Sequence, residues 1–514
     1  RLADISSPST FPPEDWQSGD ELVSVNQSVN AYALNTLSSK IMLAGMPPGQ
    51  VGWKFTPIES KLDEEAQQDP ELFSKVTYAL ARRAEQHRTR LEATKARSAS
   101  TLYYKLLLLT GNAAVLWTSI DTPVVYNMHN YVVKRDASGV DIAGAIKVSV
   151  SRMAADPDVV DAADRNREAK GLHAENKNPW DDEITLYHVQ KLVVREDGTR
   201  GYAYWQEVEG GHVIDGTEAF TPFDVPTIYF GGMIPEYGSD WYLPYCLDYE
   251  GDMQAVENYS AALQDGGAAA ARFLTLVDPS GQTELKDILE ADNLEVVPGR
   301  EQDVSTLRAD KGGDLAVTAN EMEKAARRLG QAFLMFSSVQ RQGERVTAEE
   351  WRILAQEIDQ AMGGLYSMIA QTSQRFFTLR FIFLHEETDK SIGKLPEGLV
   401  RTTVITGIDS LGQSAEGQNL REFMAEAKEA LGDALVQHIN PADYLKRLAA
   451  HKNIKAEGLV KDQQQIEADS AQQQQDAAQQ TLMDKATGPL ATGGASILGK
   501  MLEGSVPVPE GLMQ

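Results

Sequence analysis

Two apolar stripes of helical period are joined through the polar run Val339-Gln340-Arg341-Gln342-Gly343-Glu344-Arg345-Val346-Thr347-Ala348-Glu349-Glu350. One stripe repeats at helical spacing over residues 316–336, and the other continues from this run nearly to His385. Thr347 and Glu350 form a capping box, in which each side chain accepts a hydrogen bond from the other residue's backbone amide, so the second helix begins here. The pair Gly363-Gly364 in the middle of the second stripe predicts a kink or hinge.

A third helical pattern, residues 248–271, precedes these two, and a mixed insert of about 45 residues separates it from 316–336. Within the insert we expect strands at Phe273–Val277 and Leu294–Val297 and a short helix at Glu284–Glu290. Periodicity alone therefore predicts an antiparallel helical pair with an exposed charged loop.

The rest of the chain alternates between helical and extended patterns. We expect helices at 28–45, Leu80–Lys95, Leu102–Trp117 and, in two pieces, 418–451. We expect strands at Val124–Arg135, Ile142–Ser151, Ile184–Arg195, Gly201–Val208 and, with a turn, within 400–413. The polar segment Asp156–Pro179 indicates a loop or short helix, and a Gln-rich segment then leads to a loosely ordered tail.

Charge and composition exclude several classes of protein. The chain has 514 residues, and its net charge is 48 − 75 = −27. A protein that coats nucleic acid needs a basic face, so this class is disfavoured, although DNA could still slide past without sticking. A single cysteine, Cys246, rules out an internal disulfide framework, and the start at Arg1 shows no signal peptide. The longest apolar stretch, Leu106–Trp117, is too short to cross a bilayer, so we expect a soluble, intracellular or particle-borne protein.

Catalytic signatures are incomplete throughout. Residues 494–501 match part of a phosphate-binding loop, but Met501 stands where a hydroxyl should hold magnesium and no strand precedes the loop. His385-Glu386-Glu387 could suggest a metal site, but a histidine at a helix C-terminus is favoured by the helix dipole alone. We therefore expect no catalytic residue, no metal ligand and no cofactor.

The run 339–350 closely resembles the strongest motif of the portal proteins, or head-to-tail connectors, of T7-like short-tailed bacteriophages (Podoviridae-like phages). Further segments resemble the same family in the same order: Asn35-Thr36-Leu37-Ser38-Ser39-Lys40-Ile41-Met42-Leu43, Gly111-Asn112, Tyr131-Val132-Val133-Lys134-Arg135-Asp136, Tyr237-Gly238, Gly251-Asp252 with Glu257-Asn258, Gly363-Gly364-Leu365-Tyr366-Ser367 and Thr406-Gly407-Ile408. The matches span roughly residues 30 to 430. After about residue 455 only the Gln-rich character matches, and most of the family's opening helix is missing before Arg1.

The resemblance implies a mainly α subunit with β elements (α+β) that assembles into a dodecameric ring around a central channel. By position, the wing would be 1–243 (helices plus a β-rich part) and would resume in the long kinked helix and following strand at 347–414. The stem helices would be 244–271 and 316–338, the clip 272–315 and the tunnel loop 339–346. The crown helices would be 415–480, before the tail at 481–514.

The same resemblance implies a phage portal at one capsid vertex of the virion, through which double-stranded DNA is packaged and ejected. The implied partners are eleven further copies of the chain, transient DNA, a terminase packaging motor, the major capsid and scaffold proteins, and a tail adaptor. No membrane partner is implied, and assembly would occur in the host cytoplasm. The chain would not be an enzyme, because the packaging motor would supply the force.

Six residues of the tunnel loop are the candidate channel residues: Gln340, Arg341, Gln342, Gly343, Glu344 and Arg345. Arg341 and Arg345 would form basic rings at the constriction, while Glu344 would limit their attraction for phosphate. Gly343 would let the loop flex, and Gly363-Gly364 would act as its hinge. Equally, Arg341 and Arg345 could pair with carboxylates of a neighbouring subunit.

Two alternatives of a different kind stay open on the sequence. A structural adaptor or scaffold without a DNA channel would share the helical architecture but not the channel. A nucleic-acid-processing enzyme of the same assembly, such as a packaging nuclease or ATPase, is disfavoured by the incomplete phosphate loop and by the absence of a clustered carboxylate motif.

Overall fold

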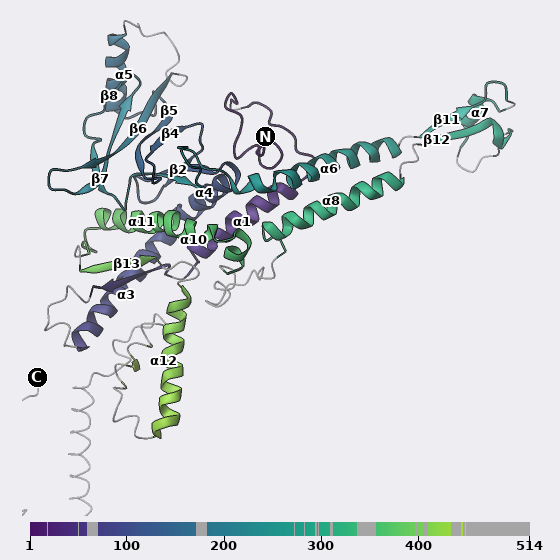
Figure 1. Cartoon of the computed structure of the whole chain (residues 1–514). Helices are drawn as coiled ribbons and strands as arrows, with labels where there is room; N and C mark the ends of the chain where they lie inside the picture. The colour runs from purple at the N-terminus through teal and green to yellow at the C-terminus, as the bar shows by residue number, and fades with distance from the viewer. Residues whose placement is uncertain are drawn as a thin grey trace, which may run out of the picture. The chain divides into compact units, whose positions relative to one another are not determined.

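The computed structural model describes residues 1–17, 19–49, 51–58, 70–170, 182–271, 273–281, 283–292, 296, 298–308, 312–336, 356–395, 399–404, 410–432, 441, 444–445 and 448. The chain divides into two compact units, Arg1–Glu416 and Gly417–Gln514. Nearly all described elements belong to the first unit, and helix α12 (Ser410–Leu431) leads into the second (Figure 1).

The centre of the first unit is a helical core built from α1 (Val29–Gly45), α4 (Ala96–Thr110) and α11 (Arg375–Thr388). The helix α3 (Pro70–Glu92) also packs on α11. Aromatic rings fill this core: Trp117, Tyr103, Phe377 and Phe381 are all fully buried. The Tyr103 hydroxyl lies 2.8 Å from the Ser373 hydroxyl, so the one polar group of that ring is paired inside the core.

Two antiparallel sheets adjoin the helical core. In the three-stranded sheet, β2 (Asn112–Leu116) lies between β10 (Ile228–Gly232) and β3 (Val124–Tyr126), and all its residues are buried. The larger sheet follows the order β4 (Tyr131–Arg135), β5 (Asp141–Ser151), β6 (Glu183–Val194), β7 (Arg200–Val208) and β8 (His212–Val213), and β9 (Ala219–Pro222) also pairs with β7. Apolar residues of both sheets pack together around Ile146, Ile228 and Phe230.

Smaller elements complete this part of the chain. The helix α5 (Pro157–Ala169) packs Val159 and Ala162 against Ile184 and Leu186 of β6. A short sheet pairs β1 (Trp53–Pro57) with β13 (Val400–Val404), two strands that are distant in sequence. In this sheet β1 contacts α3, and β13 contacts α11.

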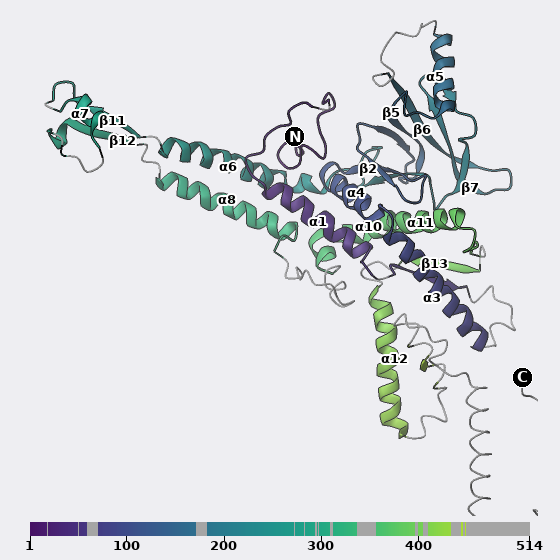
Figure 2. The same ribbon diagram turned by 180° about the vertical axis from the view of Figure 1, so that it is seen from behind.

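A long helical pair follows, and it carries a small mixed element. The helices α6 (Glu250–Ala271) and α8 (Gly312–Ala332) lie side by side in both views (Figures 1 and 2). Between them the chain forms β11 (Phe273–Val277), α7 (Leu285–Glu290) and β12 (Val304–Arg308), and the two strands pair antiparallel. Apolar residues occupy the contact side of the pair near the body, where Met253, Val256, Ala325 and Leu329 are buried.

The long helix expected after residue 347 is interrupted in the described part. Residues 356–362 are helical, and the break falls at Gly363 and Gly364, whose φ angles are +59° and +88°. The chain then continues through α10 (Leu365–Ile369), a π-helical turn at Ala370–Gln374 and α11. The position of the break was predicted, because two glycines adopt left-handed backbone angles at little steric cost. The π turn was not predicted.

Several sequence-based boundaries were wrong. The helix expected at Leu102–Trp117 ends at Thr110, and residues 112–116 form the buried strand β2. The single strand expected at Val124–Arg135 is two strands, β3 and β4, which lie in different sheets. The described partner of β11 is β12, whereas the expected strand Leu294–Val297 lies almost entirely outside the described residues. By contrast, the helix α5 agrees with the loop or short helix expected within Asp156–Pro179.

Candidate functional site

The predicted channel residues Gln340, Arg341, Gln342, Gly343, Glu344 and Arg345 lie outside the described residues. The structure does describe the chain on both sides of them, up to Phe336 and again from residue 356. The candidate site is therefore built from the end of α8, from the helical turn 356–362 with its glycine break, and from the body elements that contact both.

The end of α8 is a tight C-terminal turn. The Met335 amide donates to the Gly330 carbonyl at 2.8 Å, and the Leu334 amide donates to the Gln331 carbonyl at 3.3 Å. This is the Schellman pattern, which requires a left-handed residue that is usually glycine. Here Leu334 has φ +56°, at a cost of about 1 kcal/mol or more, so surrounding contacts must hold it.

Two side chains from the body reach this turn. Lys40 of α1, which is buried, donates from its Nζ to the Leu334 carbonyl at 2.7 Å. The Tyr245 hydroxyl, in the short 3₁₀ helix Tyr245–Tyr249, donates to the Ala332 carbonyl at 3.1 Å. Burial lowers the pKa of Lys40 and Glu357 raises it, with burial the larger influence. The turn is thus held by hydrogen bonds that originate outside α8.

The glycine break beyond residue 362 has its own polar contacts. The Gly364 amide donates to the Asp359 carbonyl at 3.2 Å, and the Ser367 hydroxyl donates to Asp359 Oδ1 at 3.0 Å. Among the described residues, no heavy atom outside the local backbone lies within 4 Å of a Cβ built on Gly363 or Gly364. Backbone angle rather than crowding therefore selects glycine at both positions.

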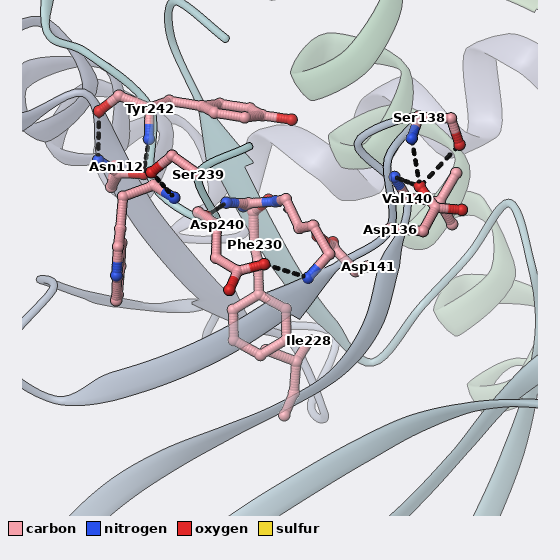
Figure 3. Close-up of polar contacts among 12 residues, drawn as sticks. Asn112, Asp136, Ser138, Val140, Asp141, Ile228, Phe230, Ser239, Asp240 and Tyr242 are labelled. Atoms are coloured by element: carbon pink, nitrogen blue, oxygen red, sulfur yellow. Dashed lines mark hydrogen bonds and ion pairs between the residues drawn. The ribbon is translucent and has the colours of Figure 1, made fainter. Parts of the chain in front are cut away.

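Two of the motif segments make hydrogen bonds in the β-rich part. The Asn112 side chain donates from Nδ2 to the Tyr242 carbonyl at 2.7 Å and accepts from the Tyr242 amide at 3.0 Å (Figure 3). Asp136 Oδ1 accepts from the Ser138 and Val140 amides and caps the β4–β5 turn in the same view. The Asn112 contacts fix loop 233–244, which includes Tyr237-Gly238, onto β2.

Arg135 is the buried charge of this region. Its side chain is 2% exposed and pairs with Asp141 Oδ1 at 2.9 Å. Its guanidinium also donates to the Phe230 carbonyl at 2.9 Å and to the Asp240 carbonyl, and it lies 4.4 Å from the centre of the Tyr242 ring. Burial raises the pKa of Asp141 to about 6, against the opposing influence of Arg135. This cluster joins β4, β5, β10 and loop 233–244.

The motif residues of α6 also bridge segments. Asp252 pairs with Arg328 of α8 across the helical pair. Glu257 accepts from the Asn26 amide at 2.9 Å and from the Gln27 side chain at 3.1 Å, which ties the N-terminal segment to α6. The residues singled out by the resemblance are thus inter-element contacts in this part of the chain.

The histidine at the end of α11 is part of the core. His385 Nδ1 lies 2.9 Å from His87 Nδ1, and Glu386 pairs with Arg83 at 2.6 Å. Burial, the neighbouring His385 and Arg83 lower the pKa of His87 to about 3, so both rings are neutral at physiological pH. Within the described residues there is no group of three or more metal-binding side chains, and no described helix is long and apolar enough to cross a membrane.

The described residues combine a helical core, antiparallel sheets and a long helical pair that carries a small strand pair. Residues 10–460 match the model of the family described as bacteriophage head to tail connecting protein. The chain belongs to this family, and its function is that of a head-to-tail connector.

Curated relatives agree with this assignment over most of the chain. The portal protein of Enterobacteria phage T3 is 28% identical over 96% of this chain and 89% of that protein. The portal protein of Escherichia phage T7 is 28% identical over 96% and 90%. The portal protein of Enterobacteria phage SP6 is 29% identical over 79% and 75%. The predicted resemblance to T7-like portal proteins is confirmed.

A chain from the neck of a native GTA particle, computed with C12 symmetry, covers 82% of this chain and 89% of its own length at 10% identity. Its TM-score is 0.32.

Sequence reasoning missed the residues that hold the site together. Lys40 falls on the apolar stripe of α1 between Leu37 and Ile41, and a single lysine on such a stripe is the signal that could have identified it. Tyr245 carries no comparable signal, because its partners Ala332 and Ala361 are distant in sequence. The roles of Asn112 and Arg135 also depend on contacts that no local pattern predicts.

Proposed function

We propose that the chain is the subunit of a dodecameric phage portal, with double-stranded DNA passing through its central channel during packaging and ejection. Family membership over residues 10–460 is the observation that carries the proposal. The ring would occupy one capsid vertex of the virion and would assemble in the host cytoplasm. It would have no catalytic role, because a terminase motor would supply the packaging force.

Exposure along the helical pair supports assembly into a ring. The end of α6 away from the body is exposed from Gly267 to Ala271, and Val317 on α8 is 65% exposed. Glycine and alanine allow helices to approach closely, and an exposed apolar stretch on a long helix needs a covering surface. Neighbouring copies of the same helical pair would provide that surface, so α6 and α8 are proposed as the stem.

The small element between the stem helices is proposed as the clip. Its exposed apolar side chains include Leu276 of β11, Leu289 of α7 and Val296. A partner that covers these side chains would gain hydrophobic stabilisation. We propose that the packaging motor and then the tail adaptor dock on this element, while the wing, up to residue 243 and from 347 to 414, meets the capsid and scaffold proteins.

The segment 339–346 is proposed as the tunnel loop. Twelve copies carry a formal charge of 12 × −27 = −324, a field that repels phosphate and limits adhesion of DNA. Arg341 and Arg345 would add basic rings within this field, and Gly363-Gly364 would let the loop move relative to the wing. The helices from 415 to 480 would form the crown.

Native mass spectrometry and negative-stain imaging test the ring. We expect a particle near 12 × 56.4 ≈ 677 kDa with a central hole. A subunit that stays monomeric even when the scaffold protein is supplied would contradict the proposal.

A second experiment separates the portal from an adaptor without a channel. The double variant Arg341→Ala/Arg345→Ala should form intact rings but change the length or retention of packaged DNA. Unchanged DNA retention in intact rings would favour the adaptor, and failure of the rings to assemble would place both arginines in subunit interfaces.

A further inference from the structure

The described residues on either side of segment 337–355 contact the same part of the body. The entry is the strained turn after α8, with Leu334 at φ +56°. The exit is the helical turn 356–362, which ends at the Gly363-Gly364 break. Contacts that fix the separation and orientation of these two flanking turns therefore also fix the start and end points of the chain between them.

Lys40 of α1 contacts the end of α8, and a residue of 356–362 influences its charge. Its Nζ donates to the Leu334 carbonyl at 2.7 Å, which is the carbonyl of the strained residue itself. On the other side, the carboxylate of Glu357 is near enough to stabilise the charged form of Lys40. Glu357 Oε2 is buried and has no hydrogen-bond partner among the described residues.

Tyr245 bridges the same two ends from another element. Its hydroxyl donates to the Ala332 carbonyl at 3.1 Å, and the Ala361 carbonyl lies at 3.5 Å from the same oxygen. The ring is buried and lies 5.5 Å, centre to centre, from the ring of Phe333. Burial raises the pKa of Tyr245, so the hydroxyl keeps its proton and remains a donor.

Packing alone does not explain this chemistry. A buried ammonium is costly to desolvate, and an apolar side chain of the same length would fill the space beside Leu37 and Ile41 at lower cost. Two polar groups from different elements, Lys40 and Tyr245, each contact a carbonyl at the end of α8. Tyr245 also contacts the Ala361 carbonyl, and Glu357 favours the charged form of Lys40. Directional bonds of this kind specify geometry more than they add stability.

We propose that Lys40 and Tyr245 are positioning residues that join the end of α8 to the helical turn 356–362 and so fix the two points between which segment 337–355 runs. The consequence for DNA rests on the proposed function, in which this segment bears the channel residues Arg341 and Arg345. Each subunit's body would then set the placement of its own channel segment.

Limited trypsin digestion of the assembled full-length ring tests the proposal directly. Arg341 and Arg345 are cleavage sites inside the segment, and mass spectrometry distinguishes their products from cleavage after Arg195, an exposed reference site in the β6–β7 turn. We expect Lys40→Met and Tyr245→Phe each to change the rate of cleavage at Arg341 and Arg345 at least threefold relative to the reference site. Unchanged relative rates in both variants would overturn the proposal.

A double variant separates positioning from stability. Lys40→Met leaves Glu357 buried without its cation, whereas Lys40→Met/Glu357→Leu removes both charges. We expect the double variant to recover the wild-type melting temperature while the altered cleavage at Arg341 and Arg345 persists, because the Leu334 carbonyl still lacks its donor. Recovery of both properties together would show that Lys40 acts only through stability, and the proposal would fail.

The same digestion distinguishes this proposal from the proposed channel role. If Arg341→Ala/Arg345→Ala rings retain DNA normally, the channel role fails, yet Tyr245→Phe would still alter cleavage in the segment. If the arginine variants change DNA retention while Tyr245→Phe and Lys40→Met leave cleavage unaltered, the channel role stands and the positioning role fails.

Discussion

Arg135 offers the sharpest residue-scale prediction, because its guanidinium is buried and contacts four groups. Replacing it with Met leaves Asp141 as an unpaired carboxylate and leaves the Phe230 and Asp240 carbonyls without their donor. Breaking a buried pair from one side costs about 3–5 kcal/mol. We expect Arg135→Met to lower the free energy of unfolding by roughly this amount in urea denaturation followed by circular dichroism.

The neighbouring residue on the same strand is the matched control. Lys134 pairs with Asp240 at 2.9 Å, but its side chain is 69% exposed. Exposed pairs contribute about 0–1 kcal/mol, so Lys134→Met should leave the unfolding curve nearly unchanged. Equal losses of unfolding free energy in the two variants would show that the contacts of Arg135 do not depend on burial for their stabilising effect.

The buried His188 lets us predict the direction in which the free energy of unfolding changes with pH. It is buried beside the Tyr204 hydroxyl at 2.7 Å, and burial lowers its pKa to about 4. An unfolded histidine has a pKa of about 6.5, so above that pH neither state binds the proton and stability is unaffected. Below it the unfolded state protonates first, and the free energy of unfolding should fall by up to about 3 kcal/mol as the pH drops to 4.

Urea denaturation at several pH values between 7.5 and 4 checks this sign. His188→Gln should flatten the curve, whereas His212→Gln, which changes a half-exposed side chain on β8, should not. Asp141, whose pKa is raised to about 6, should increase the free energy of unfolding as the pH falls, because the folded state binds this proton before the unfolded state does. The difference between wild type and variant therefore isolates His188; parallel curves for wild type and His188→Gln would refute its assignment.

At the scale of elements, the Gly363-Gly364 break carries the next prediction. Both residues have left-handed φ angles, which cost other residues about 1–2 kcal/mol each. Gly363→Ala/Gly364→Ala should therefore lower the melting temperature of the ring by several degrees or drive residues 356–369 toward a continuous helix. If the break is also the hinge of the tunnel loop, packaged DNA length should change in rings that still assemble.

Gly251 provides the control for that substitution. It lies in the helix α6 without a left-handed φ, and no described residue crowds its Cβ position. Alanine is the better helix former by about 1 kcal/mol, so Gly251→Ala should be neutral or stabilising. Tolerance of alanine at 363 and 364 equal to that at 251 would argue that the break is not conformationally required.

Elements were predictable where one face of a segment is apolar and the other polar. The helices α1 and α8 follow from apolar spacing, and the break follows from the glycine pair. Residues 112–116 were misassigned because β2 is buried on both faces and therefore shows no alternation. The available signal was Gly111, which ends α4 in a left-handed cap.

The candidate site was less predictable than the fold. The resemblance identified Gln340–Arg345 as channel residues. The contacts to the described residues that precede this segment come from Lys40 of α1 and from Tyr245, which are far away in sequence. Spacing along a chain does not encode which distant carbonyl a lysine will reach. The hydroxyl of Tyr245 and the Nζ of Lys40 became interpretable only once the elements were placed together.

At the scale of the whole molecule, net charge predicts how the proposed ring would interact with DNA. A protein that grips duplex DNA neutralises phosphates, and its affinity then falls steeply with salt, with a slope of about −0.9 for each phosphate contacted. A ring with 12 × −27 = −324 formal charges should instead repel DNA everywhere except at local basic rings. We therefore expect weak binding of short duplexes to purified rings and a shallow salt dependence.

Substitution of Glu344 tests whether the channel residues or the net charge of the whole ring set the adhesion of DNA. Glu344→Gln removes twelve negative charges from between Arg341 and Arg345, whereas Glu236→Gln removes the same number at an exposed position elsewhere in the chain. If the channel residues govern adhesion, only the first variant should bind duplex DNA more tightly, steepen the salt slope measured by fluorescence anisotropy, and slow ejection. Equal effects of both variants would mean that net charge alone keeps DNA from sticking, and the local role of Glu344 would be lost.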